Sequence, residues 1–466
     1  MKQDLLYQLI DRLSKRQVRE IEHWLASPLH CQREEIARFF SLIKDSRLEL
    51  GILLSPEEMW QRLWPDQDFH PGDWRQMRHR LLKQLENYLV FDLQRRRPYE
   101  QRRQLLTAYR ELGLDNQLRT RLNRYRPDQE AGLDRYYYEY RHEIERYRVG
   151  SGAEGRRRVD NIYDQETQLE RFVLAMGLRQ ACTTLAHRRM HQLDYELALL
   201  PYLLQQAAQE KYQQEAGVRL YYLAVQLYLQ PATEAEPYYR ELRQGLIKES
   251  DHFPPSDQHN LLILAINHGL RESNAGREAY LEDTLELQQF GLQQGSILEA
   301  GKLSTRTFNN IVAVAIRLGE TQWATSFIDQ YENLLPTAGR SEITSLARAR
   351  IALLQEDYSA TLGFLQEADY QDFYHHMTAR VLQMKVYFAR DNYNLISSHV
   401  RATRSFLRRR RQMSYHQSNY SNIFRLAQRI TRLPPRDRTA QAKVREEILQ
   451  TEPCTERPWL LSVLER

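Results

Sequence analysis

The sequence predicts an all-α protein, an α-solenoid of stacked helix pairs that follows a small N-terminal helical module. Gly and Pro are sparse among the 466 residues, at 18 and 16, whereas helix-forming residues dominate. No stretch alternates apolar and polar residues as a half-buried strand does. Trp323, Tyr358 and Tyr393 recur at intervals of 35 residues, each close to the start of a helical stretch. Such a period is typical of repeated helix pairs.

Residues 1–95 are expected to form the N-terminal module. Apolar side chains three or four positions apart predict helices over residues 3–13, 15–26 and 32–45. Ser55 precedes Pro-Glu-Glu, which is a capping box with Pro at the first helical position, so a helix is expected from Pro56 to about Leu63. A longer helix over roughly 72–93 completes the module.

Three further segments follow the module. Residues 96–160 read as basic helices rich in Tyr and Arg, ending in a flexible loop at Gly150 to Gly155. Residues 161–435 are interpreted as the helical repeats, and residues 436–466 as a C-terminal helical tail. A chain of this length exceeds what one compact core serves, and an array in which each unit packs on its neighbours accommodates it.

The repeat is clearest in three successive helix pairs. They are predicted over 304–318 with 321–334, 340–355 with 358–368, and 374–390 with 392–407. The second helix of each pair begins near an aromatic residue that follows a polar turn, and we expect this aromatic side chain to wedge between the two helices. The pattern resembles the tetratricopeptide repeat family, whose unit is two antiparallel helices.

That resemblance implies a concave surface formed by the first helices, which binds an extended or helical protein segment. Polar residues on the first helices are the expected groove positions: Asn309, Arg317, Arg348 and Arg350, with Asn310 as an alternative to Asn309. The chain from about residue 20 to 430 also resembles a family of uncharacterised bacterial helical-repeat proteins. The motifs that carry this likeness are Trp24-Leu-Ala-Ser-Pro28, Leu63-Trp-Pro-Asp66, Glu299-Ala-Gly-Lys-Leu-Ser304, Asn309-Asn-Ile-Val312 and Phe406-Leu-Arg-Arg409.

No catalytic, cofactor or metal site is expected. His187 and His191 share a helix face, but a metal normally needs a third or fourth ligand, and Arg188 beside them would repel a cation. Gly150 to Gly155 fits GxGxxG on paper, yet a charged helix precedes it where the dinucleotide fingerprint needs a strand. Cys31, at a predicted helix start, is interpreted as an ordinary thiol. We therefore expect a protein that is not an enzyme.

The segment from Ser55 to Leu89 has a second interpretation. It is similar to the helix-turn-helix core of bacterial winged-helix transcription activators, which would make residues 1–95 winged-helix-like. The resemblance implies that the helix from about Asp73 enters the DNA major groove, with Arg75, Arg78 and His79 facing the bases. Opposing it, no β-hairpin wing is readable after Leu89, and both arginines also suit a solvated helix face.

The strongest local anomaly is an acid-free stretch. From Asn392 to Arg436 there are ten arginines and no acidic residue, although the whole chain carries a net charge of only +5. Cations beside aromatic residues suit an acidic peptide or a nucleic-acid backbone, while cations at a helix end also favour the helix dipole. The candidate basic patch comprises Arg401, Arg404, Arg408, Arg409, Arg410, Arg411, Tyr415 and Tyr420.

Function and location follow from these observations. The chain lacks a run of apolar residues long enough to span a membrane, and its three cysteines are far apart, so a cytoplasmic protein is expected. The preferred hypothesis is a protein-protein interaction scaffold for a protein or peptide ligand, which the basic patch suggests is acidic. The alternative is a nucleic-acid-binding regulator that uses the helix-turn-helix-like segment and the arginine-rich stretch.

Overall fold

The chain is helical throughout the part that the structure describes. The structure is a computed structural model, and it describes residues 4–52, 54–124, 133–150, 160–191, 196–409, 415–434 and 437–465. Within these ranges there are helices and turns but no β-strand, which confirms the all-α prediction. Residues 151–155 of the expected glycine-rich loop lie outside them. Every described helix is too short or too polar to cross a lipid bilayer.

Two compact units divide the chain, Met1–Val173 and Leu174–Arg466. The boundary between them falls within one long helix, α9. The helices of the first unit are α1 (Leu5–Ile10), α2 (Lys15–Ala26), α3 (Glu34–Ile43), the π-helix η1 (Lys44–Glu49), α4 (Pro56–Leu63), α5 (Pro71–Arg95), α6 (Pro98–Glu111), α7 (Asp115–Arg124), α8 (Arg135–Gly150) and the first part of α9 (Asp160–His191).

The N-terminal module has its own hydrophobic core, formed by α1 to α5. Apolar side chains at the predicted spacing, such as Ile10, Phe39 and Leu85, are fully buried in it. The capping box at Ser55 is present: the Ser55 hydroxyl accepts from the Glu58 amide at 3.1 Å, and the Glu58 carboxylate accepts from the Ser55 amide at 2.6 Å. α5 runs on to Arg95 and α6 begins at Pro98, so no β-hairpin wing separates them.

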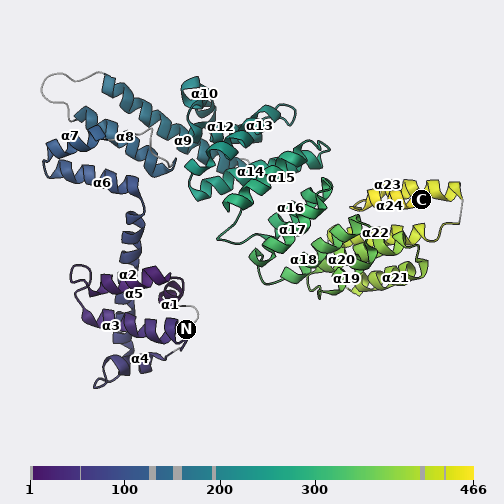
Figure 1. The fold of residues 1–466 in the computed structure, drawn as a ribbon, viewed down its shortest axis with the longest axis horizontal. Coiled ribbons are helices and arrows are strands. Elements are labelled where there is room, and N and C mark those ends of the chain that lie inside the picture. Colours follow the sequence, from purple (N-terminus) through teal and green to yellow (C-terminus); the bar gives the residue numbers. More distant parts are fainter. Residues whose placement is uncertain are drawn as a thin grey trace. The chain divides into compact units, whose positions relative to one another are not determined.

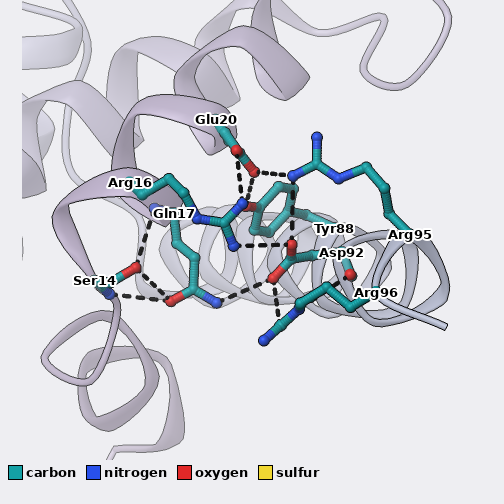
Figure 2. Close-up of polar contacts among 8 residues, drawn as sticks. All are labelled: Ser14, Arg16, Gln17, Glu20, Tyr88, Asp92, Arg95 and Arg96. Carbon is teal, nitrogen blue, oxygen red and sulfur yellow. Dashed lines mark hydrogen bonds and ion pairs between the residues drawn. The ribbon is translucent and has the colours of Figure 1, made fainter. Parts of the chain in front are cut away.

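A polar network ties the start of α2 to the end of α5 (Figure 2). At its centre is Asp92, whose side chain is fully buried. Asp92 accepts from Gln17 at 3.3 Å, from Arg16 at 3.2 Å and from Arg96 at 2.5 Å. The Gln17 side chain also accepts the Ser14 amide at 3.0 Å and so completes the N-terminal cap of α2. The Gln17 carboxamide therefore caps α2 through its oxygen and binds Asp92 of α5 through its nitrogen.

The second unit contains the repeats. Its helices are α10 (Leu200–Ala207), α11 (Glu210–Gln213), α12 (Ala216–Leu229), α13 (Glu236–Glu249), the 3-10 helix η3 (Ser250–His252), α14 (Pro255–Asn274), α15 (Tyr280–Gln294), α16 (Thr305–Arg317), α17 (Thr321–Tyr331), the 3-10 helix η4 (Glu332–Leu334), α18 (Arg340–Leu354), α19 (Tyr358–Gln366), α20 (Phe373–Ala389), α21 (Tyr393–Arg409), α22 (Tyr415–Ile430), α23 (Arg438–Gln450) and α24 (Arg457–Leu464).

Consecutive helices of this unit pack as antiparallel pairs, α12 with α13 through to α20 with α21 (Figure 1). The three pairs predicted from the sequence are confirmed with ends that agree within a few residues. First helices also pack on first helices, since α12 contacts α14, α16 contacts α18 and α18 contacts α20. The unit therefore has a layer of first helices and a layer of second helices, as expected for a solenoid.

The repeat register differs from the one that the aromatic residues predicted. In three successive turns the same bond recurs, from the amides of Glu320, Asp357 and Asn392 to carbonyls five positions earlier. By this criterion the counterpart of Tyr358 is Thr321, so Trp323 lies two positions later in its helix than Tyr358 does. The spacing of 35 residues is structural only between Tyr358 and Tyr393.

The expected aromatic wedge is also wrong. Tyr393 is 55% exposed, and Trp323 and Tyr358 are half-buried at the rim of their helices. Trp323 stacks along its own helix on Phe327, with ring centroids 5.5 Å apart, instead of inserting between helices. The space between α16 and α17 is filled instead by Ala324 and by the buried rings of Phe308 and Phe327, whose centroids lie 5.1 Å apart.

The C-terminal helices close the array. Val444 and Ile448 of α23 share a buried core with Phe424 of α22, so the expected tail packs as part of the second unit. Leu460 of α24 is fully buried in the same core. Thr455 and Glu456, just before α24, contact Asn419 of α22 and Lys385 of α20, which places them among the first helices.

Candidate functional site

A groove runs along the first helices of the second unit. We call it the open groove. It has a volume of about 860 Å³ and is lined by residues of α9, α12, α14 and α16, with no second helix contributing. This is the surface on which the repeat resemblance implies a ligand, and its position follows from the layered packing.

A stripe of asparagines marks the open groove. Asn260, Asn267 and Asn274 lie seven positions apart on α14, and since seven residues make two helical turns, they share one face. Asn310 joins them from α16. Asn274 accepts a hydrogen bond from Arg317 at 3.0 Å. Across the described part of the chain, the side chains of the other three make no hydrogen bond, so their carboxamides face the groove with donors and acceptors unused.

Arginines supply the charge of the open groove. Four line it, namely Arg179, Arg189, Arg271 and Arg306, and no acidic residue is among its described lining. The Arg189 guanidinium lies over the Tyr228 ring, 5.4 Å from its centroid. Burial, and after it the neighbouring Arg271 cation, lower the pKa of Arg189. A ligand anion beside Arg189 would offset both effects.

Two acidic residues beneath the groove floor hold half of these cations. Asp257, 1% exposed, pairs with Arg179 at 2.5 Å. Glu272, also 1% exposed, pairs with Arg271 at 3.1 Å. Arg271 also donates to Nδ1 of His268 at 2.8 Å, and burial lowers the pKa of His268 to about 4, so this imidazole stays neutral. Arg179 and Arg271 are thus fixed in place, whereas Arg189 and Arg306 have no acidic partner among the described residues.

A second hollow, of about 670 Å³, continues along the first helices. It is lined by α16, α18, α20 and α22, by Glu356 and Tyr358 where α19 begins, and by the C-terminal segment, which we define as residues 452–464. One face of α16 serves both hollows: Arg306 and Asn310 line the open groove, and Ala313 and Arg317 line the second hollow. These spacings of four, three and four positions form one stripe, so the two hollows are successive stretches of one groove.

The expected groove positions are divided between faces. Asn310 lines the open groove, and Arg317 and Arg350 line the second hollow. Arg348 instead pairs with Asp329 of α17 at 2.8 Å, and with Glu332 of η4, on the side of the second helices. Asn309 lines neither hollow, so of the two adjacent asparagines the alternative is the groove residue.

The structure describes four side chains of the candidate basic patch, and these four differ in their surroundings. Arg401 and Arg408 are exposed on α21, and Arg404 donates to Gln428 of α22 at 2.6 Å. Tyr420 instead lines the second hollow with its hydroxyl 3.5 Å from Thr378, a site that no described α21 residue lines. Four members remain: Arg410 and Arg411 lie outside the described residues, as do the side chains of Arg409 and Tyr415.

The candidate DNA-facing residues lie near the start of α5. Arg75 and His79 are exposed there, and Arg75 donates to the Pro71 carbonyl at 3.4 Å. Arg78 is half-buried, forms an ion pair with Asp4 and lies over the Tyr7 ring. Its guanidinium therefore holds α1 on α5.

The asparagine stripe was missed at the level of sequence, although a signal for it exists. Asn260, Asn267 and Asn274 stand at a heptad spacing within one predicted helix. Charged clusters can be recognised in a sequence without knowing which helix face is buried, whereas groove-facing asparagines cannot.

Comparison of the chain with protein-family models, curated proteins and solved structures gives no match.

Proposed function

We propose that this protein is a non-enzymatic, cytoplasmic interaction scaffold that binds an extended acidic protein segment in the open groove. The observation that carries the proposal is the set of unused carboxamides of Asn260, Asn267 and Asn310 beside Arg189 and Arg306. Each carboxamide offers both a donor and an acceptor, which is what the backbone of an extended peptide requires.

The same chain contains an example of this recognition. Asn419 of α22 accepts from the Thr455 amide at 2.8 Å and donates to the Thr455 hydroxyl at 3.0 Å. Asn422, one turn on, donates to the Pro453 carbonyl at 3.1 Å. Two asparagines of one helix thus hold a non-helical stretch of backbone. Asn260, Asn267 and Asn310 have the same groups available.

Charge selects the class of ligand. An acidic side chain would pair with Arg189 or Arg306, which pair with no described carboxylate, and the planar guanidinium suits a bidentate carboxylate contact. A basic segment would be repelled by Arg189 and Arg306, which no described carboxylate compensates. The ligand is therefore a protein segment with acidic side chains, bound through its backbone and its charge together.

The test begins with a phage-displayed dodecapeptide library selected on the full chain. We expect the selected peptides to be enriched in Asp and Glu. Their binding is then measured by fluorescence anisotropy against the wild type and against Asn267→Ala/Asn310→Ala. The variant loses two backbone contacts, each worth about 0.5–1.5 kcal/mol. We therefore expect its affinity for the peptides to be lower than that of the wild type by a factor of about ten or more.

The matched control is Asn394→Ala. Asn394 is exposed on the second helix α21, outside both hollows, so its removal should leave peptide affinity unchanged. Equal affinity of the selected peptides for the groove variant and the wild type would contradict the proposal. So would enrichment of basic peptides.

A further inference from the structure

The C-terminal segment lies in the groove as a bound ligand would. Its first residues, Pro453 to Thr455, are not helical and are held through the backbone by Asn419 and Asn422. Asn419 and Asn422 belong to α22, the first-layer helix that follows α20. A segment at the end of the chain is therefore bound by side chains of the same type that line the open groove.

Charge and aromatic contacts extend the binding along α20. Glu456 pairs with Lys385 at 2.7 Å. Trp459 meets Phe388 edge to face, with ring centroids 5.4 Å apart, and the Lys385 ammonium lies 5.5 Å from the Trp459 ring. Glu456, Trp459 and Val463 all line the second hollow, and their spacing of three and four positions puts them on one face.

The segment does not use everything that the second hollow offers. A volume of about 670 Å³ remains beside it. Arg350 of α18 lines this volume, and within the described chain no hydrogen bond or ion pair holds its guanidinium. Glu456 is close enough to act on Arg350 electrostatically but is paired with Lys385. A ligand with a second acidic side chain would gain a contact that the C-terminal segment lacks.

We propose that the C-terminal segment is a resident ligand of the second hollow, and that a partner helix of the same chemistry replaces it. That partner carries an acidic residue three positions before a tryptophan, an aliphatic residue four positions later, and a further acidic side chain for Arg350. This proposal extends the proposed binding function to a different stretch of the groove, and it names a helical partner there.

Replacement is a competition between a tethered and an untethered ligand. The tether gives the C-terminal segment an effective concentration of roughly millimolar order. A free copy of the segment therefore binds the wild type weakly, whereas weakening the tethered copy exposes the site. The additional ion pair with Arg350 is what allows a partner helix to displace the tethered C-terminal segment.

The test uses the full chain and a fluorescein-labelled peptide of residues 451–465. Glu456→Lys/Trp459→Ala in the protein removes the ion pair and the aromatic anchor of the tethered copy and leaves the lining residues of α16, α18, α20 and α22 in place. We expect the peptide to bind this variant at least about tenfold tighter than the wild type in fluorescence anisotropy. If the variant keeps its helical circular dichroism and binds no tighter, the proposal is overturned.

A charge exchange checks that the peptide occupies the second hollow. For this check the tethered copy carries Glu456→Ala/Trp459→Ala, so that no reversed ion pair forms within the chain. Adding Lys385→Glu to that variant should abolish binding of the peptide, and a peptide with Glu456→Lys should restore it. Binding that is indifferent to residue 385 would place the peptide elsewhere and refute the proposal. Should the double variant fail to fold, Glu456→Lys alone supplies the same comparison, with a smaller gain in affinity.

The two proposals fail independently. Asn267→Ala/Asn310→Ala alters the open groove and leaves Lys385, Phe388 and Asn419 untouched, so it should not change binding of the 451–465 peptide. If the 451–465 peptide binds as expected but no selected peptide binds the open groove, only the resident-ligand proposal is supported. If the selected peptides bind and the 451–465 peptide does not, only the open groove is supported as a binding site.

Discussion

Asp92 shows how one residue fixes the N-terminal module. Its carboxylate is fully buried, and Gln17, Arg16 and Arg96 surround it (Figure 2). Burial alone acts to raise the pKa of Asp92, but the Gln17 hydrogen bond and the charges of Arg96 and Arg16 outweigh it, so the pKa lies below its ordinary value. The buried charge is therefore compensated, and its partners, not its burial, stabilise the fold.

Replacing this carboxylate should weaken the module in a pH-dependent way. Asp92→Asn keeps the shape but loses charge-assisted hydrogen bonds, and we expect a loss of about 1–2 kcal/mol at pH 7. Because the folded pKa is lower than the unfolded value near 3.9, the carboxylate stabilises the fold above about pH 4. That contribution is lost as the pH falls through the folded pKa.

Urea unfolding, followed by circular dichroism at several pH values, measures this difference. The gap between wild type and Asp92→Asn should be largest at neutral pH and should shrink below about pH 4. Asp68→Asn is the matched control, because Asp68 is exposed in the same module and forms no ion pair with a described residue. A gap that stays constant from neutral to acid pH would exclude the charge as its source.

Residue type could be predicted for the groove, but the face of each residue could not. Arg348 and Arg350 are both polar positions of one helix, two positions apart, so they point to different sides. Only packing decides that Arg350 lines the second hollow while Arg348 meets Asp329. The sequence alone leaves open which stripe of an amphipathic helix faces its neighbours, since every first helix is buried on more than one side.

At the scale of the element, the turns between paired helices hold the repeat register. Gly319, Glu356 and Asp391 end the first helices in the left-handed conformation, with φ of 77°, 58° and 50°. Glycine adopts this conformation without strain, whereas other L-residues pay for their Cβ atom. The second helix follows two residues later at Thr321, Tyr358 and Tyr393.

Opposite substitutions in equivalent turns should have opposite effects. Gly319→Ala is expected to destabilise the second unit by about 1 kcal/mol. A Cβ at Gly319 would meet no atom within 4 Å, so conformational strain is the only cost. Glu356→Gly relieves the same strain and should stabilise by up to about 1 kcal/mol, after the extra freedom of glycine in the unfolded chain is deducted.

Thermal unfolding of the two variants beside the wild type tests this pair. The midpoint should fall for Gly319→Ala and rise for Glu356→Gly. A fall for both would mean that the Glu356 side chain makes a stabilising contact that outweighs its strain. A higher midpoint for both variants would mean that the left-handed turn residue is not what fixes the repeat register.

Helix boundaries were predictable because caps and apolar spacing are local signals. Ser55 and its Glu58 gave the start of α4 correctly. The repeat register could not be predicted. The aromatic residues that suggested it lie at the rims of their helices, whereas the register is defined by a backbone conformation in the turns. Glu356 and Asp391 give little sign in the sequence that they adopt a glycine-like φ.

For the whole molecule, the distribution of charge is a better guide to its ligands than the net charge is. A net charge of +5 gives little attraction for nucleic acid, yet α21 carries Arg401 and Arg408 exposed in a stretch without acidic residues. The groove arginines are on first helices, and those of the acid-free stretch begin on a second helix. Peptide binding and nucleic-acid binding are thus separable by substitution, although the sequence alone did not distinguish the two surfaces.

We expect only weak, non-specific nucleic-acid binding. Scattered surface arginines neutralise phosphates at low ionic strength, and such binding falls steeply as salt rises. Filter binding of single- and double-stranded oligonucleotides should therefore detect affinity at low salt and none at about 0.15 M. Arg401→Gln/Arg408→Gln should reduce the low-salt binding while leaving the selected peptides at full affinity. Tight binding that survives physiological salt and is lost in this variant, or in Arg75→Gln/His79→Gln, would replace the scaffold with a nucleic-acid-binding regulator.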